Sequence, residues 1–167
     1  MTVVVDLGCH HHPEHQGASQ DSIARLIERY KPHTLYGFDP HSQLAAGVTV
    51  ENGTEVYRVC EAAWIMDGET TYAEAGLSSS VGSGGDPVTC IDTARLIREV
   101  FEFYADDDVV LKADIQGSEY AVLEWLITTG AIKCVSYLLV EWHPVDGWEA
   151  RKAAILERMT CPVEEWT

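Results

Sequence analysis

Thr2-Val3-Val4-Val5-Asp6-Leu7 begins the chain with apolar and β-branched residues at consecutive positions. A strand buried on both faces of a parallel sheet has this pattern, because neither face meets water. A polar loop follows, and apolar residues then recur at helical spacing between Ile23 and Tyr30, with Ser19 and Asp21 as candidate N-caps. Thr34 to Phe38 is a second apolar strand. The stretch therefore predicts a β-α-β unit, which normally crosses over right-handed.

Strands and helices continue to alternate along the chain. Asp67-Gly68 is a hairpin turn signal that we expect to pair Glu55–Ile65 with Thr70–Tyr72. A small, polar loop is expected over Gly76–Gly85. The remaining expected elements are helix Asp92–Tyr104, strand Val109–Asp114, helix Ser118–Thr129, strand Val135–Glu141 and helix Trp148–Met159. This order predicts one α/β domain over residues 1–167, with a doubly wound, mostly parallel sheet and helices on both faces.

Composition narrows the classes of partner. Asp and Glu number 27 against 11 Lys and Arg, giving a formal charge of -16, and no basic run is present. Binding to a nucleic-acid duplex or to anionic lipid is therefore disfavoured. The five cysteines are scattered and odd in number, which indicates reduced thiols and a cytoplasmic location. We expect no signal peptide and no membrane span, and the sequence does not predict an oligomeric state.

Acidic residues stand at the ends of four predicted strands: Asp6, Asp39, Asp114 and Glu141. In a doubly wound sheet, ligands bind beyond the carboxyl ends of the strands, where the strand order reverses. Because these ends share one edge, the four carboxylates predict an acidic binding crevice.

The loop after the first strand indicates the kind of ligand. Gly8 lets the backbone approach a ligand closely, but the G-x-G-x-x-G pattern that seats a pyrophosphate is absent. Asp39 stands where an acid accepts hydrogen bonds from a ribose diol, although an aspartate before Pro40 is also a common turn residue. These residues favour a cationic nucleoside with a carboxylate tail.

Four segments of the chain resemble the FkbM-type methyltransferases. They are Val3-Val4-Val5-Asp6-Leu7-Gly8, Leu35-Tyr36-Gly37-Phe38-Asp39-Pro40, Leu111-Lys112-Ala113-Asp114-Ile115-Gln116-Gly117-Ser118-Glu119 and Leu139-Val140-Glu141-Trp142-His143-Pro144. The resemblance covers residues 2 to 144. The third segment is the most specific, because that family typically has a Lys-hydrophobic-Asp-x-x-Gly-x-Glu signature, whereas the first two are shared by most class I methyltransferases.

The resemblance implies a Rossmann-like class I fold, S-adenosylmethionine as methyl donor, and O-methylation of a small molecule, sugar or glycan. The positions that it assigns to the cofactor are Asp6, Gly8, Cys9, Ser19, Asp39, Pro40, Glu61, Ala62, Ala63 and Asp114. It places Asp114 on the acceptor side as well, with Glu141 and His143 bordering the acceptor site.

The chain departs from the family pattern in three places. The loop Cys9–Gln16 is long and rich in histidine, and Gln116 stands where the family usually has Glu. Adjacent histidines in one loop rarely converge on a metal ion, so we do not expect a metal there. The chain stops near the point where a class I sheet begins its last antiparallel pair, so we expect a sheet trimmed at its C-terminal edge.

Methyl transfer to a hydroxyl needs positioning and removal of a proton. His143 is the first candidate base, since its reference pKa is near neutrality, and Asp114 is the second. A Mg²⁺ ion on Asp114, Glu141 and His143 is a separate possibility, because a metal would activate the acceptor hydroxyl. Glu119, in the first turn of a helix, has the simpler interpretation of a residue that complements the helix dipole.

Two other functions stay open at this point. An acid after the second strand also serves NAD-dependent oxidoreductases, but the missing glycine fingerprint disfavours them. A shortened relative that binds the cofactor without catalysis is the non-enzymatic alternative.

Overall fold

The computed structural model describes residues 1–9, 21–41, 44–73, 80–82 and 84–167. Ser19, the histidines of the loop after Cys9, and much of the loop expected over Gly76–Gly85 lie outside the described residues.

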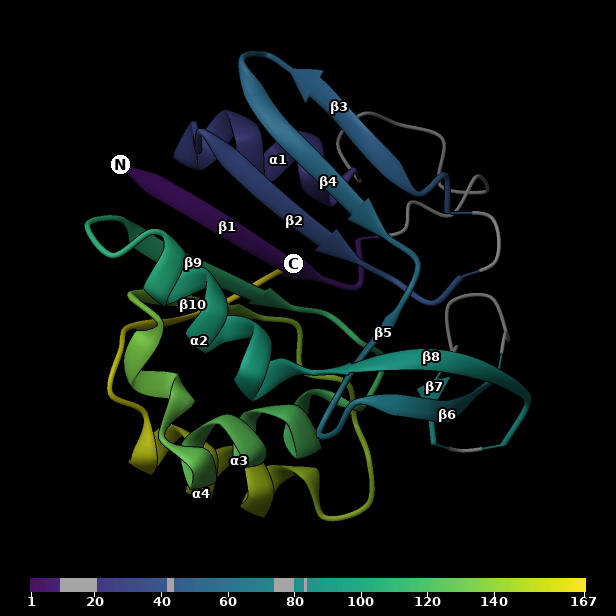
Figure 1. Ribbon diagram of the computed structural model, residues 1–167. Helices are drawn as coiled ribbons and strands as arrows, with labels where there is room; N and C mark the ends of the chain where they lie inside the picture. The colour runs from purple at the N-terminus through teal and green to yellow at the C-terminus, as the bar shows by residue number, and fades with distance from the viewer. Residues whose placement is uncertain (10–20, 42–43, 74–79, 83) are drawn as a thin grey trace.

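A seven-stranded sheet forms the centre of the molecule (Figure 1). Its strands, in spatial order, are β11 (Val163–Glu165), β10 (Tyr137–Val140), β9 (Asp108–Ala113), β1 (Thr2–Leu7), β2 (Thr34–Phe38), β4 (Thr54–Val59) and β3 (Gly47–Glu51). Only β3 runs antiparallel to its neighbour among these strands as described. The predicted α/β class with a mostly parallel sheet is thus confirmed.

The strand order reverses between β1 and β9. From β1 the chain moves outward through β2 to β4 and β3, and it later returns to β9 on the other side of β1 and moves outward to β10 and β11. Asp6 pairs in register with Lys112, and Leu7 with Ala113. The crevice that such a reversal creates therefore lies beyond Leu7 and Ala113.

Within the described residues four α-helices connect the strands, and local signals in the sequence set several of their ends. Helix α1 (Ser22–Tyr30) begins after Asp21, whose side chain accepts from the amide of Ala24. Helix α2 (Thr93–Phe103) is capped in the same way by Asp92. Helix α3 (Glu119–Thr129) ends at Gly130 in the left-handed conformation, and α4 is Trp148–Arg158. These helices confirm the sequence predictions to within a residue or two at each end.

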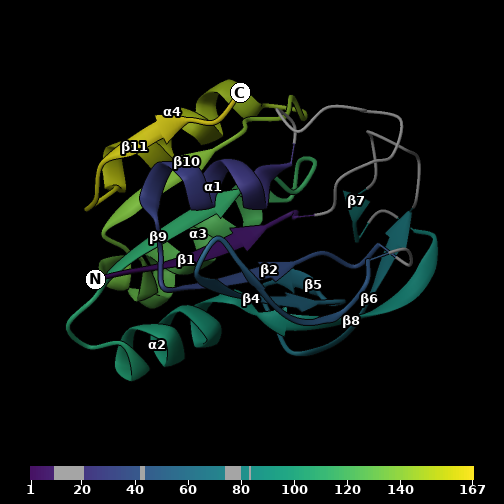
Figure 2. The ribbon, with the colours of Figure 1, turned by 90° about the horizontal axis from the view of Figure 1, so that it is seen from above.

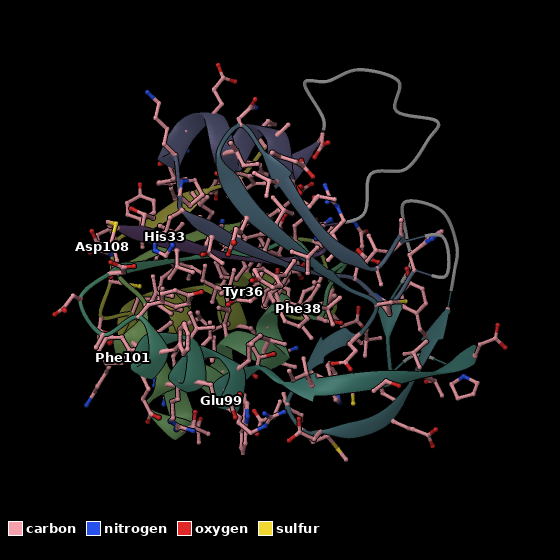
Figure 3. The ribbon with its side chains drawn as sticks, turned by 45° about the horizontal axis from the view of Figure 1, so that its top comes forward. His33, Tyr36, Phe38, Glu99, Phe101 and Asp108 are labelled. Atoms are coloured by element: carbon pink, nitrogen blue, oxygen red, sulfur yellow. The ribbon has the colours of Figure 1, made fainter. Side chains whose placement is uncertain are left out.

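The two faces of the sheet bury separate cores. Helix α1 and Trp166 pack with Val4, Leu35 and Val110 on one face. Helices α2, α3 and α4 lie with the alternate residues of β1 and β9 on the other. Figure 2 shows α1 and α2 on opposite sides of β1 and β2, and Tyr36 and Phe38 on β2 lie on the α2 side (Figure 3). Helices on both faces confirm the expected double winding.

A second, smaller sheet corrects the expected hairpin. Its order is β5 (Ala62–Trp64), β8 (Asp86–Asp92), β6 (Gly68–Ala73) and β7 (Ser80–Val81). The segment around Thr70–Tyr72 pairs antiparallel with β8 and not with the strand before Asp67. The Asp67 carboxylate instead accepts from the amide of Asp92 and pairs with Arg95 at the start of α2, so long-range partners override the local turn signal.

The sequence analysis missed two strands of the main sheet, and it also missed β7 and β8 of the smaller sheet. β7 lies within the loop expected over Gly76–Gly85. β3 pairs with β4, and β11 extends the sheet beyond β10 in the parallel sense. The edge where we expected trimming thus carries one more strand, and the described residues place no antiparallel strand there.

Candidate functional site

Gly8 and Asp114 meet where the strand order reverses. The φ of Gly8 is +84°, and a Cβ placed on it would lie 1.8 Å from the main-chain oxygen of Asp114. The amide of Gly8 donates to Phe38 of β2, and the amide of Asp114 donates to Leu7 of β1. A side chain at position 8 would push these strand ends apart, so glycine is required by the fold at this point.

A buried lysine connects the ends of β1 and β9 at this point. The Nζ atom of Lys112 lies 2.9 Å from Asp6 Oδ1 and 3.2 Å from Asp114 Oδ2, and it donates to the carbonyl of Gly8 at 2.8 Å. Ser22 of α1 donates to the other oxygen of Asp6 at 2.6 Å. Lys112 and Asp6 are both fully buried. The ammonium therefore has three oxygen atoms within 3.2 Å and joins β1 to β9.

Burial and pairing act in opposite directions on these groups. Burial, the largest effect, lowers the pKa of Lys112, but Asp6 and Asp114 together outweigh it and raise that pKa above its usual value. Burial raises the pKa of the Asp6 carboxyl, and Lys112 and Ser22 oppose that rise. Asp6 is thus fully buried, and its charge influences the exposed side of the strand ends through Lys112 and Asp114.

The turn between β9 and α3 explains the Lys-hydrophobic-Asp-x-x-Gly-x-Glu signature. Gln116 and Gly117 both have positive φ, and a Cβ on Gly117 would lie 2.9 Å from Val145. The fully buried Glu119 carboxylate closes the turn by accepting from the amides of Ile115 and Gly117, each at 2.8 Å. The motif therefore builds both the lysine bridge and this turn.

The ring of His143 lies among three carboxylates at the same edge of the sheet. Its Nδ1 is 2.8 Å from Glu119 Oε1, and its Nε2 lies 3.9 Å from Asp114 and 3.7 Å from Glu141. One ligand atom from each of Asp114, Glu141 and His143 falls within 4.8 Å of the others, and all three side chains are partly exposed. The structure therefore brings together the three residues that the sequence singled out for the acceptor side.

Charge around the imidazole shifts its protonation. Burial lowers the pKa of His143, but the hydrogen bond and charge of Glu119, with Asp114 and Glu141, raise it above its usual value overall. Burial and the neighbouring Asp114 raise the pKa of Glu141. The surrounding carboxylates thus favour the protonated form of the imidazole.

The predicted nucleoside side of the site lies at the end of β2. The Asp39 carboxylate accepts from the amide of His41 at 2.9 Å, and the amide of Asp39 donates to Val59 of β4. Pro40 follows and is partly exposed. These contacts fix the turn at the same edge of the sheet as Gly8.

Cys9 lies under the β2 strand end. A Cβ on Gly37 would be 2.9 Å from the sulfur of Cys9, so the missing side chain leaves room for it. Cys9 is buried, and burial raises the pKa of its thiol well above its usual value. The thiol therefore packs in the α1 core and stays protonated.

Glu61, Ala62 and Ala63 begin the smaller sheet. Ala62 and Ala63 are buried in β5, and Glu61 is partly buried just before it. This sheet lies beyond the carboxyl ends of β2 and β4 (Figure 1). The three residues thus border the same end of the main sheet as Asp39.

Sequence reasoning missed the roles of Lys112, Ser22 and Glu119. Lys112 and Glu119 were visible as letters of the signature, but their partners are set by the pairing of β1 with β9 and by the return of the chain after β10. A lysine within an otherwise apolar strand was the one available signal, since a buried lysine requires an acidic partner.

A groove of about 690 Å³ opens at the opposite end of the strands. Its lining includes Thr2, Ile27, Pro32 and Thr54. Asp114, Glu141 and His143 are not among its lining residues, and we assign the groove no part in the site.

Comparison of the chain with protein-family models, with curated proteins and with solved structures gives no match. No helix in the described ranges is both long and apolar enough to cross a bilayer.

Proposed function

We propose that the chain binds S-adenosylmethionine at the carboxyl ends of β1, β2 and β9 and transfers its methyl group to a hydroxyl of a small molecule, sugar or glycan. The observation that carries this proposal is the contact of Gly8 with Asp114 at the strand-order reversal, in a crevice bordered by Asp39, Asp114 and Glu141. A sulfonium is favoured by surrounding carboxylates, and a ribose diol is favoured by an acid after the second strand.

The charges of the crevice argue against a pyrophosphate ligand. Lys112 lies at these strand ends, and its ammonium is already engaged by Asp6, Asp114 and the carbonyl of Gly8. An NAD-type cofactor would bring two phosphate charges next to these carboxylates, while the ammonium of Lys112 is already paired with Asp6 and Asp114. This charge balance favours the sulfonium nucleoside over a dinucleotide.

In the proposed reaction the donor supplies an activated methyl group, and the protein positions the acceptor and removes its proton. Nε2 of His143 takes that proton, since it faces the crevice while Nδ1 is engaged by Glu119. Asp114 and Glu141 stabilise the imidazolium that forms. Asp39 and Pro40 hold the ribose, Gly8 and Cys9 border the amino-acid half, and Glu61, Ala62 and Ala63 border the adenine.

Mg²⁺ on Asp114, Glu141 and His143 is the second way to activate the hydroxyl. The three donors are close enough to share an ion. Mg²⁺ prefers oxygen ligands, however, and one of these donors is an imidazole, while Lys112 already neutralises Asp114. The donor set thus favours His143 as base.

All five cysteines are free, in agreement with a reducing compartment, so we place the reaction in the cytoplasm. Calorimetric titration of the purified protein with S-adenosylhomocysteine, NADH and Mg²⁺ tests the ligand. We expect binding of S-adenosylhomocysteine alone. Binding of NADH without S-adenosylhomocysteine would refute the proposal. If S-adenosylhomocysteine binds but radiolabelled donor methylates no acceptor pool, the chain is the non-catalytic relative instead.

A further inference from the structure

Glu119 is a carboxylate with no access to solvent, which a role in complementing the helix dipole does not require. It lies in the first turn of α3 and reaches His143, which follows β10. We propose that Glu119 is a positioning residue that keeps the proton of neutral His143 on Nδ1, so that the lone pair of Nε2 faces the acceptor. This inference rests on the proposed methyl transfer.

The contacts of Glu119 determine which tautomer it selects. Oε1 already accepts from the amide of Ile115 at 2.8 Å, and Oε2 accepts from the amide of Gly117 at 2.8 Å. Two main-chain amides thus prevent the carboxylate from rotating. An ionised carboxylate only accepts, so the 2.8 Å contact with Nδ1 of His143 requires a proton on Nδ1.

The main chain of His143 is held by the neighbouring residue of the same helix. The buried Tyr120 donates its hydroxyl proton to the carbonyl of His143 at 3.0 Å. Helix α3 therefore fixes both the backbone and the ring of a residue that lies outside any helix or strand. Nε2 remains more than 3.5 Å from the carboxylates of Asp114 and Glu141, which leaves its lone pair without a direct hydrogen bond to them.

Glu119→Gln replaces one accepting oxygen by an NH₂ group. If that group takes the place of Oε1, it meets the amide of Ile115 donor to donor, donates to Nδ1 and forces the proton of His143 onto Nε2, which removes the base. If it takes the place of Oε2, it meets the amide of Gly117 donor to donor and weakens the turn. Glu124→Gln is the matched control, because Glu124 lies on the same helix and its described partner, Arg151, is not part of the site.

The experiment is NMR of the ring nitrogens in protein labelled with ¹⁵N-histidine, with the His143 signals assigned by their loss in His143→Gln. We expect neutral wild-type His143 to be protonated on Nδ1, Glu119→Gln to increase the Nε2-protonated form, and Glu124→Gln to leave the spectrum unchanged. Neutral wild-type His143 protonated on Nε2 would overturn the proposal. The wild-type measurement decides the matter even if Glu119→Gln does not fold.

Kinetics separate this inference from the proposed function. Glu119→Gln is expected to lower kcat for methyl transfer at least ~100-fold, the size of a lost general base, with the KM of the acceptor changed less than about 2-fold. A rise in KM at constant kcat would show a role in binding and would contradict a positioning role. If wild-type protein does not bind S-adenosylhomocysteine, the methyl-transfer proposal fails on its own, and the NMR result still reports the tautomer.

Discussion

Lys112→Met removes the buried ammonium while keeping a side chain of similar length. Asp6 would then be a fully buried carboxylate whose remaining described side-chain partner is Ser22, and Gly8 would lose its donor. Removing one partner of a buried ion pair costs about 3–5 kcal/mol, because the other charge stays uncompensated. That is a large part of the ~5–15 kcal/mol that stabilises a typical domain. We therefore expect a protein near the limit of folding at neutral pH.

The assay is urea unfolding at several pH values, with the midpoint read at constant slope. In Lys112→Met the lost cation lets burial raise the pKa of Asp6 further, so the folded state takes up a proton more readily than the unfolded state. Stability should then increase as pH falls from neutrality, in the direction opposite to a salt-bridged acid. Asp6→Asn in the same chain removes the charge and should restore at least half of the loss.

Lys152→Met is the control, since Lys152 pairs with the mostly exposed Glu165 at the surface. Such a pair is worth about 0–1 kcal/mol, so this change should barely move the midpoint. A loss below about 1 kcal/mol for Lys112→Met, or a pH dependence equal to that of the wild type, would refute the assignment of Lys112 as the charge that holds Asp6.

Three further predictions concern the crevice. Gly8→Ala should destabilise the fold by more than ~3 kcal/mol in thermal unfolding, because the added Cβ would collide with backbone. Gly53→Ala, also at positive φ but with open space around it, should cost about 1 kcal/mol, and equal losses for the two variants would contradict the close approach of Gly8 to Asp114. Asp39→Ala should weaken S-adenosylhomocysteine binding about 10-fold or more in calorimetry with unchanged folding, and the exposed Asp146→Ala should not; unchanged affinity for Asp39→Ala would exclude the ribose role. The rate of methyl transfer should rise with pH through a midpoint above 6.5, because the pKa of His143 is raised and the base is protonated at lower pH. His143→Gln should abolish that rise, and a rate independent of pH between 5 and 9 would exclude His143 as base.

The sequence predicted those parts of the fold that local chemistry controls. Among the described helices, α1 and α2 begin after the caps Asp21 and Asp92 and α3 ends at Gly130, and the central strands are largely apolar. β3 escaped prediction because most of its residues are exposed and it exists through pairing with β4. β11 has only three residues and depends on β10 in the same way.

The same distinction between local chemistry and strand pairing applies to the site. Parallel strands end at one edge, so the acids at the ends of β1, β2, β9 and β10 could be placed together from the sequence. The sequence could not predict which of these acids is buried and which faces solvent, since that depends on the register of the strands. Asp6 pairs with Lys112 because their strands align at those two positions, 106 residues apart.

Asp114 joins the two halves of the site. Its Oδ2 contacts the lysine that lies on the α1 face of the sheet, and its Oδ1 faces His143, which is held from the other face by α3. A change in the lysine bridge therefore alters the charge that His143 meets, and a change in Glu119 alters the group that Asp114 faces. Because the two networks share this carboxylate, Lys112→Met and Glu119→Gln should not be additive in their effect on the His143 pKa. Additive shifts for the first pair would mean that the two halves are independent and that Asp114 does not connect them.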